Sequence, residues 1–336
     1  MMEIGNSLQT KRNPIVNRLA SLSLRYFKDN LGILIALFVI GLFLQIYTKG
    51  IFLGSKNVLN VLRQVSINAN LACGLTMIII LGGIDLSVGS GVALSGVITG
   101  GLIAFDGWAI LPACVVGVAV VTCIGAFNGF IISRTGIPPF VVTLATMNIA
   151  RGAAYVYTNG QPIRIMDDAF TQIGMGYLGS IPLPVIYSTI FLIATAFILN
   201  KTRLGRHIYA VGGNREAARF AGIKINRVLQ FAYTFSGLMA GVSGVVLAAR
   251  MFSSQPTAGD GAEMDAIAAT VLGGTSMMGG SGRIGGTLIG VLIIGVLSNG
   301  LNLMNVNSFW QYIVKGIVIL LAVYVDVIKN NNKLRK

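Results

Sequence analysis

Residues 109–133 read AILPACVVGVAVVTCIGAFNGFIIS, a run of 25 residues without a charged side chain. A helix of about 20 apolar residues crosses the hydrocarbon core of a bilayer, so this stretch predicts a transmembrane helix. The same measure applied outward along the chain gives nine more candidates. The sequence therefore predicts an all-α, polytopic transmembrane helix bundle of about ten spans, at 31–48, 58–82, 86–105, 109–133, 137–158, 185–200, 228–249, 264–280, 284–303 and 309–328.

The composition of the whole chain agrees with a membrane bundle. Of its 336 residues, 54% are hydrophobic and only 11% are charged, against about 25% charged in an average soluble domain. A soluble enzyme, a secreted disulfide scaffold and a disordered chain are excluded. The three cysteines lie in apolar runs without metal-type spacing, so no redox or metal site is expected from Cys73, Cys114 and Cys123.

The basic residues predict an orientation. With the N-terminus in the cytoplasm, 18 Lys and Arg lie inside and five outside, which is the bias of an inner (plasma) membrane protein. Both termini are then cytoplasmic. The expected organisation is a basic segment at 1–30, a transmembrane domain at 31–328 with its largest cytoplasmic loop at 201–227, and a basic tail at 329–336.

A short glycine-rich pattern occurs twice. Leu81-Gly82-Gly83 with Gly89-Ser90-Gly91 recurs 191 residues later as Leu272-Gly273-Gly274 with Gly280-Ser281-Gly282. Many transporters descend from duplicated halves whose broken helices line the substrate site. Six matches in a chain with 43 glycines are also compatible with chance, so both interpretations stay open.

The 201–227 loop contains a pattern typical of a short helix. Asn214 is a good N-cap residue, Glu216 falls in the first turn, and Gly222 is placed to end the helix. Ala217, Ala218 and Ala221 form a small face that we expect to enter a groove on another protein. The seven cations of the loop would also suit a segment that lies near anionic lipid headgroups.

The run Glu216-Ala217-Ala218-x-x-x-Gly222 resembles the cytoplasmic coupling motif of ATP-binding cassette (ABC) importer permeases, which docks on an ATPase subunit. The chain from about residue 31 to 328 resembles one branch of that family, the ribose-type permeases for simple sugars. The stretches that carry the resemblance are Gly82–Ser90, Val156–Ile163, Thr202–Arg206, Gln255–Gly259, Met264–Ser276 and Asn299–Leu303.

The resemblance implies a pore-forming subunit, usually present in two copies. Two ATPase subunits would drive it from the cytoplasm, and a periplasmic or lipid-anchored binding protein would deliver the sugar, with ribose the first expectation. The chain has no G-x-x-x-x-G-K-[ST] sequence, so ATP is expected on the partner, with no cofactor, metal or catalytic residue in this chain. Which sugar is carried, and whether the second permease is identical, stays open.

Polar residues inside the spans are the remaining candidates. Asn68, Asn70, Asn128 and Asn148 suit a path for a neutral sugar, although hydrogen bonds between helices explain each of them equally well. Arg151 and Lys315 are expected to form structural ion pairs or to extend toward the outer surface.

Asp85 lies at an expected helix break that also contains Gly82, Gly83 and Gly89. Its carboxylate is expected to cap the next helix, the alternative being a place in the inner gate. An ion-coupled secondary transporter of a small polar solute is the alternative function. It would need a buried acid or histidine pair, and the Glu-Ala-Ala-x-x-x-Gly run favours the importer permease.

Overall fold

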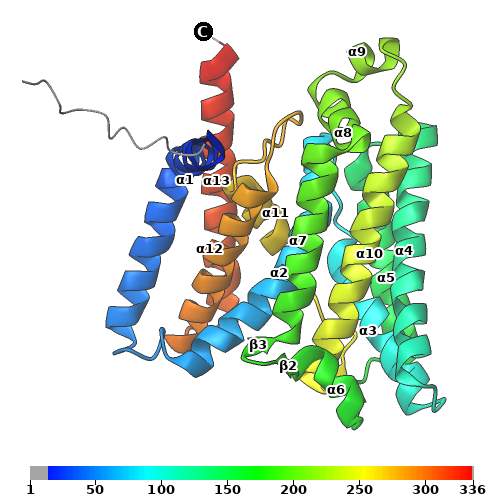
Figure 1. The fold of residues 1–336 in the computed structure, drawn as a ribbon. Coiled ribbons are helices and arrows are strands. Elements are labelled where there is room, and N and C mark those ends of the chain that lie inside the picture. The colour runs from blue at the N-terminus through cyan, green and yellow to red at the C-terminus, as the bar shows by residue number, and fades with distance from the viewer. Residues whose placement is uncertain (1–13, 335–336) are drawn as a thin grey trace, which may run out of the picture.

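The computed structural model describes residues 14–334 as a bundle of helices (Figure 1). The long helices run between two ends of the molecule. One end carries α8 (Arg203–Gly213) and α9 (Arg215–Phe220), and the other carries α6 (Asp168–Met175). Parts of the predicted terminal segments, 1–13 and 335–336, lie outside the described residues.

Nine helices of 17 residues or more in the described part of the chain coincide with nine of the ten predicted spans. Of these, α4, α7, α10 and α12 are long and apolar enough to cross a membrane by composition alone, while α1, α3 and α13 contain shorter apolar stretches. The nine helices are α1 (Pro14–Tyr47), α2 (Ser55–Ile80), α3 (Val88–Ala104), α4 (Ile110–Thr135), α5 (Pro139–Thr158), α7 (Leu183–Lys201), α10 (Ile225–Met251), α12 (Ile284–Leu303) and α13 (Ser308–Leu334).

The predicted span at 264–280 is wrong as a continuous helix. Its helix, α11 (Ala262–Leu272), has 11 residues and a length of about 16 Å, about half the hydrocarbon thickness. The chain then continues as an irregular segment to α12. Gly274, Gly279 and Gly280 in that segment have positive φ, a conformation that glycine adopts without steric cost and that ends helix geometry.

Helix α2 is central, because it contacts α7, α10, α11 and α12. From Val65 to Ile80 every residue of it is buried. Protein surrounds this part of the helix, so it can carry polar residues such as Asn70 and Thr76 without exposing them to lipid. This position explains why α2 is long but less apolar than α4 or α12.

Helices α4 and α10 approach each other through glycines. A Cβ atom on Gly125 would meet the carbonyl oxygen of Tyr233 and would lie 2.9 Å from the Cα atom of Gly237. On the other helix, a Cβ atom on Gly241 would lie 3.0 Å from the Cα atom of Val118. Close backbone approach of this kind stabilises helix pairs in a membrane, where the hydrophobic effect does not favour helix over lipid.

Two breaks interrupt the helices, and they begin alike. The first break, residues 81–87, joins α2 to α3, and the second, residues 273–283, joins α11 to α12. Each starts with a glycine of positive φ, Gly82 at 76° and Gly274 at 83°. Gly83 N donates to Ile78 O (2.9 Å) and Thr275 N to Thr270 O (3.2 Å), which is the same C-terminal capping pattern. The matching glycines are 192 residues apart, one more than in the sequence repeat.

Two pairs of short strands lie at the α6 end, and the sequence did not predict them. β1 (Ile163–Arg164) pairs with β4 (Ser253–Ser254), and β2 (Tyr177–Leu178) pairs with β3 (Ile181–Pro182), both antiparallel. Two-residue strands have no alternation that a sequence pattern could reveal.

The α4–α10 contact gives a first prediction. Gly125→Ala should lower the thermal unfolding temperature of the detergent-solubilised protein, because overpacking typically costs about 1–3 kcal/mol. Gly152→Ala is the matched control, since a Cβ atom there meets nothing within 4 Å. Equal unfolding temperatures for the two variants in a fluorescence melt would show that the two helices are not in close contact.

Candidate functional site

Local interactions define α9 at one end of the molecule. Asn214 Oδ1 accepts a hydrogen bond from Ala217 N (2.9 Å), so Asn214 is the N-cap, as the sequence predicted. At the other end Ile223 N donates to Ala218 O (3.0 Å), and Gly222 has a φ of 78°. The helix itself is short, Arg215–Phe220.

The exposed face of α9 differs from the predicted one. Ala217 and Ala221 are exposed, but Ala218 is buried, with 4% of its surface accessible, because α9 packs against α8 and α10. The prediction that all three alanines face outward is therefore wrong for Ala218. The sequence analysis also missed Phe220, which is 88% exposed; an aromatic residue in an otherwise polar and basic loop was the available signal.

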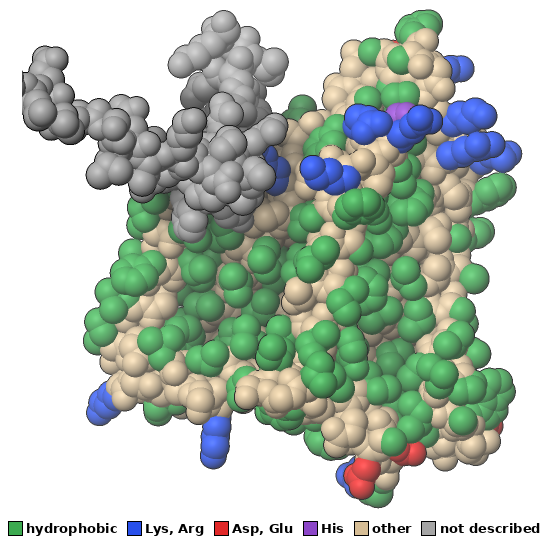
Figure 2. Space-filling view, in the orientation of Figure 1, with side chains coloured by type: hydrophobic (Ala, Val, Ile, Leu, Met, Phe, Trp, Pro, Cys, Tyr) green, Lys and Arg blue, Asp and Glu red, His purple; other side chains and the backbone are tan. Residues whose placement is uncertain are grey.

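A basic depression of about 600 Å³ lies beside α9. Figure 2 shows Lys and Arg side chains gathered at this end of the molecule, while the acidic side chains visible in that view lie near α6. An acidic surface of a partner would complement the depression. Its charged lining residues are Arg134, Arg215, Glu216, Arg219, Lys224 and Arg227.

Helix α8 connects α9 to the end of α2 and to the second break through close contacts. Gly212 lies so close that a Cβ atom there would collide with Ile80 O and would be 2.8 Å from Gly280 N. Gly280 N donates to Ile80 O at 2.8 Å. Tyr209 Oη donates to Gly282 O (2.9 Å), and burial raises the pKa of Tyr209, so its hydroxyl stays protonated. Helix α8 is therefore in direct contact with the end of α2 and with the second break.

Asp85 holds the first break in place. Its Oδ1 accepts from Ser87 N (3.0 Å) and Ser87 Oγ (2.6 Å), and its Oδ2 accepts from Ser236 Oγ on α10 (2.9 Å). Asn128 Nδ2 on α4 donates to Ser87 Oγ (3.1 Å). Thr143 Oγ1 on α5 donates to Ile84 O (3.2 Å). Asp85 therefore does not cap α3, whose N-cap residue is Ser87; it closes a turn onto Ser87 just before that helix and joins the break to α10.

Two glycines of the predicted helix break make close contacts. A Cβ atom on Gly83 would lie 2.6 Å from Tyr233 Oη, and one on Gly89 would meet Glu263 Oε2 and lie 2.5 Å from Gly259 O. Gly82 instead supplies the positive φ of the turn. Gly83 and Gly89 are therefore required for close packing, and Gly82 for the backbone conformation of the turn.

The four asparagines predicted to share a path lie on three helices and have different surroundings. Asn68 and Asn70 are buried on α2, and Asn70 Oδ1 has no hydrogen-bond partner in the described part of the chain. Asn128 is fully buried and bonded to Ser87. Asn148 is exposed on α5 and donates to Leu144 O of its own helix (3.0 Å). Their geometry does not form one site.

The two cations inside spans have defined partners. Arg151 Nη1 donates to Pro256 O (2.7 Å) and Ala258 O (2.8 Å), which fixes the segment before α11. Lys315 Nζ forms an ion pair with Asp265 Oδ2 at 2.7 Å. The structural ion pair expected of Lys315 is confirmed, whereas Arg151 binds carbonyl groups.

Within the described residues, no group of three or more His, Cys, Asp or Glu side chains is arranged to hold a metal ion. The three cysteines there are free thiols.

Comparison with known proteins identifies relatives over most of the chain. The chain is 47% identical over 300 residues to the ribose import permease protein RbsC of Bacillus subtilis, covering 89% of this chain and 92% of that protein. It is 46% identical over 279 residues to RbsC of Escherichia coli K12, covering 82% and 87%.

The xylose transport system permease protein XylH of E. coli K12 is 34% identical over 369 residues, covering 92% of this chain and 93% of that protein. No solved structure matches the chain. The family model described as "Branched-chain amino acid transport system / permease component" matches residues 57–323. Because this match covers well over half of the chain, the protein is a multi-pass membrane protein that belongs to the family of these transport permeases.

Proposed function

We propose that this protein is the membrane-spanning permease subunit of an ABC importer that carries ribose across the bacterial plasma membrane. The observation that carries the proposal is the exposed, capped helix α9, joined through α8 to the end of α2 and to the second break. The identity to ribose import permeases at 46–47%, against 34% to a xylose permease, supports ribose as the sugar.

In this proposal α9 docks on an ATPase subunit. Phe220 and the small residues Ala217 and Ala221 form the contact, and the basic depression attracts acidic groups of the partner. Closure of two ATPase subunits moves α9 and α8 together. The end of α2 and the second break move with α8, because Gly212 contacts Ile80 and Gly280 and Tyr209 is hydrogen-bonded to Gly282.

The charge distribution supports an orientation with the α9 end in the cytoplasm. The described C-terminal end of α13 also lies at this end (Figure 1), in accord with a cytoplasmic C-terminus. The opposite end, with α6 and the short strands, then faces outward and receives a sugar-binding protein. A second copy of this chain completes the pore, and apolar residues such as Leu144, Phe309 and Leu320, exposed on α5 and α13, are available for that contact and for lipid.

The docking model gives a prediction for α9. Ala217→Trp and Ala221→Trp should reduce both ATPase co-purification and ribose uptake, because overpacking at a contact costs about 1–3 kcal/mol, up to roughly a hundredfold in affinity. Phe220→Ala should act in the same direction through loss of an aromatic anchor.

The matched control for these variants is Ala36→Trp, an exposed alanine on α1, outside both the α9 end and the α6 end. Ala218→Trp is not suitable, since Ala218 is buried inside this chain. Normal ATPase pull-down and normal uptake for all three α9 variants would exclude docking at this helix.

The orientation is tested by cysteine labelling on a background that lacks Cys73, Cys114 and Cys123. A membrane-impermeant maleimide should label Gln172→Cys in intact cells, because this α6 residue is exposed. Asn214→Cys should react only after the membrane is opened. The reverse pattern would place α9 outside and contradict the proposal.

The energy source is tested separately. The purified chain should neither bind nor hydrolyse ATP, because it contains no P-loop sequence. Nucleotide binding by calorimetry and phosphate release are measured before and after the ATPase subunit is added back. Hydrolysis by the chain after every co-purifying subunit has been removed would overturn the assignment.

A further inference from the structure

A cavity of about 330 Å³ lies between α11 and α13, and the mechanism above does not use it. This volume is at the lower end of the range of small-molecule sites. The residues that matter for the argument lie on both helices and on the segment before α11. They are Asp260, Glu263, Asp265, Gln311, Tyr312 and Lys315.

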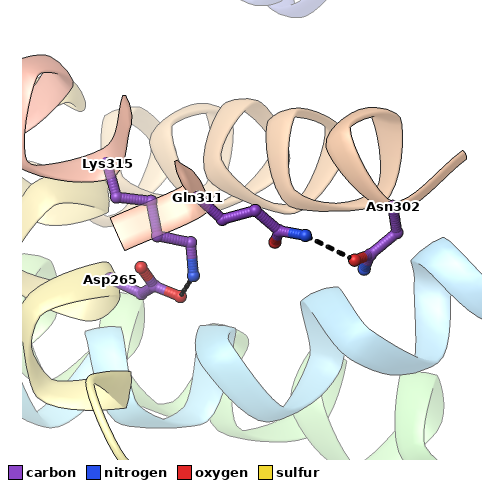
Figure 3. A network of polar contacts seen from close by, with 4 residues as sticks. All are labelled: Asp265, Asn302, Gln311 and Lys315. Atoms are coloured by element: carbon purple, nitrogen blue, oxygen red, sulfur yellow. Dashed lines mark hydrogen bonds and ion pairs between the residues drawn. The ribbon is translucent and has the colours of Figure 1, made fainter. Parts of the chain in front are cut away.

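The lining combines hydrogen-bond donors and acceptors that are fixed in place (Figure 3). Lys315 Nζ on α13 and Asp265 Oδ2 on α11 are 2.7 Å apart, with 24% and 13% of their side-chain surfaces exposed. Gln311 Nε2 donates to Asn302 Oδ1 (2.8 Å) and Val306 O (3.0 Å). Ionisable groups inside a membrane protein are costly, and they usually mark a functional path.

Glu263 is a second, independent feature of the cavity. The residue is 7% exposed; within the described range 14–334 its carboxylate interacts with its own backbone amide and makes no hydrogen bond or ion pair to another residue. Its carboxylate lies beside Gly89, in the first turn of α3. A carboxylate is favoured near a helix N-terminus, yet Glu263 keeps hydrogen-bonding capacity for a group in the cavity.

The helix geometry also points to a ligand. Helix α11 is a half-length helix that ends at the second break, and in transporters such interrupted helices commonly form the substrate site. Lys315 is the eighth residue of α13, about 10 Å along the helix from its start. The cavity therefore lies in the part of the molecule nearer the α6 end, and it is open at the surface of this chain, where Met264 and Tyr312 of its lining are 54% and 55% exposed.

We propose that this cavity is a transit site for a neutral, hydroxyl-rich sugar. The inference rests on the proposed function and adds the residues that contact the substrate. Lys315 neutralises Asp265, so the lining offers carboxylate acceptors and ammonium donors together, as hydroxyl groups require. The ring of Tyr312 offers an apolar face for the C–H groups of the sugar. A single open cavity of this size binds weakly, and weak binding permits release.

The first test is protection from labelling. In the complex reconstituted with its ATPase subunits, on the cysteine-free background, Gln311→Cys is treated with a small methanethiosulfonate over a series of ribose concentrations. Ribose should slow the labelling several-fold in a saturable manner. Lys56→Cys, exposed outside the cavity, should label at a rate that ribose does not change.

The second test is selectivity of uptake in proteoliposomes with the binding protein present. Tyr312→Ala should reduce ribose uptake about fivefold to tenfold, as expected for loss of the ring contact with the sugar, and should change the ratio of ribose to xylose uptake. Thr189→Ala, exposed on α7, should leave uptake and ratio unchanged. A merely structural role of Tyr312 would lower both sugars equally.

The outcomes separate the two proposals. If the wild-type complex does not import ribose, the proposed function fails. If it imports ribose but neither protection at position 311 nor a changed ratio is found, only the transit site is overturned. If an inorganic cation protects position 311 from labelling and ribose does not, the transit-site proposal is also overturned, because the cavity is then a cation-binding site.

Discussion

An unpaired backbone amide or carbonyl in hydrocarbon costs several kcal/mol, and the two breaks meet this constraint together. The second break donates from Gly280 N to Ile80 O at the end of α2. Outside helices supply the other partners, Thr143 for Ile84 O and Tyr209 for Gly282 O. Irregular backbone is tolerated at these points because protein groups supply hydrogen-bond partners, while residues such as Gly82, Gly274 and Met278 are exposed.

Close packing of backbone against backbone explains why glycines occupy the helix contacts. Where α8 meets the end of α2 and the second break, and where α4 meets α10, backbone touches backbone, and side chains are excluded from the contact. In such contacts there are few side chains between the two backbones that could change rotamer when one helix moves. The connection from α9 through α8 to the second break is therefore rigid, as a subunit driven by a partner requires.

The sequence predicted those parts of the molecule that depend on local interactions. Nine spans follow from apolar length, and the ends of α9 follow from Asn214 and Gly222, because a cap is made within a few residues of the chain. The span at 264–280 was wrong, because its Gly, Ala and Thr residues are as compatible with a buried half-helix and loop as with a crossing helix.

Features that depend on long-range packing were outside the reach of the sequence. The side of α9 on which Ala218 falls is determined by α8 and α10. Lys315 was expected to pair, but its partner Asp265 lies 50 residues away on another helix. The four asparagines have the right chemistry for a path, and only the structure shows that their surroundings differ, from buried Asn128 bonded to Ser87 to exposed Asn148.

The hydrogen bond between Gly280 and Ile80 also bears on how the protein is made. The two residues are 200 positions apart in the chain. At a synthesis rate of about 5–20 residues per second, Ile80 leaves the ribosome about 10–40 s before Gly280 exists. For that interval α2 carries an end that its final neighbour does not yet cover. Until Gly280 has been synthesised, the carbonyl group of Ile80 must have another hydrogen-bond partner, either water or a group of the insertion machinery.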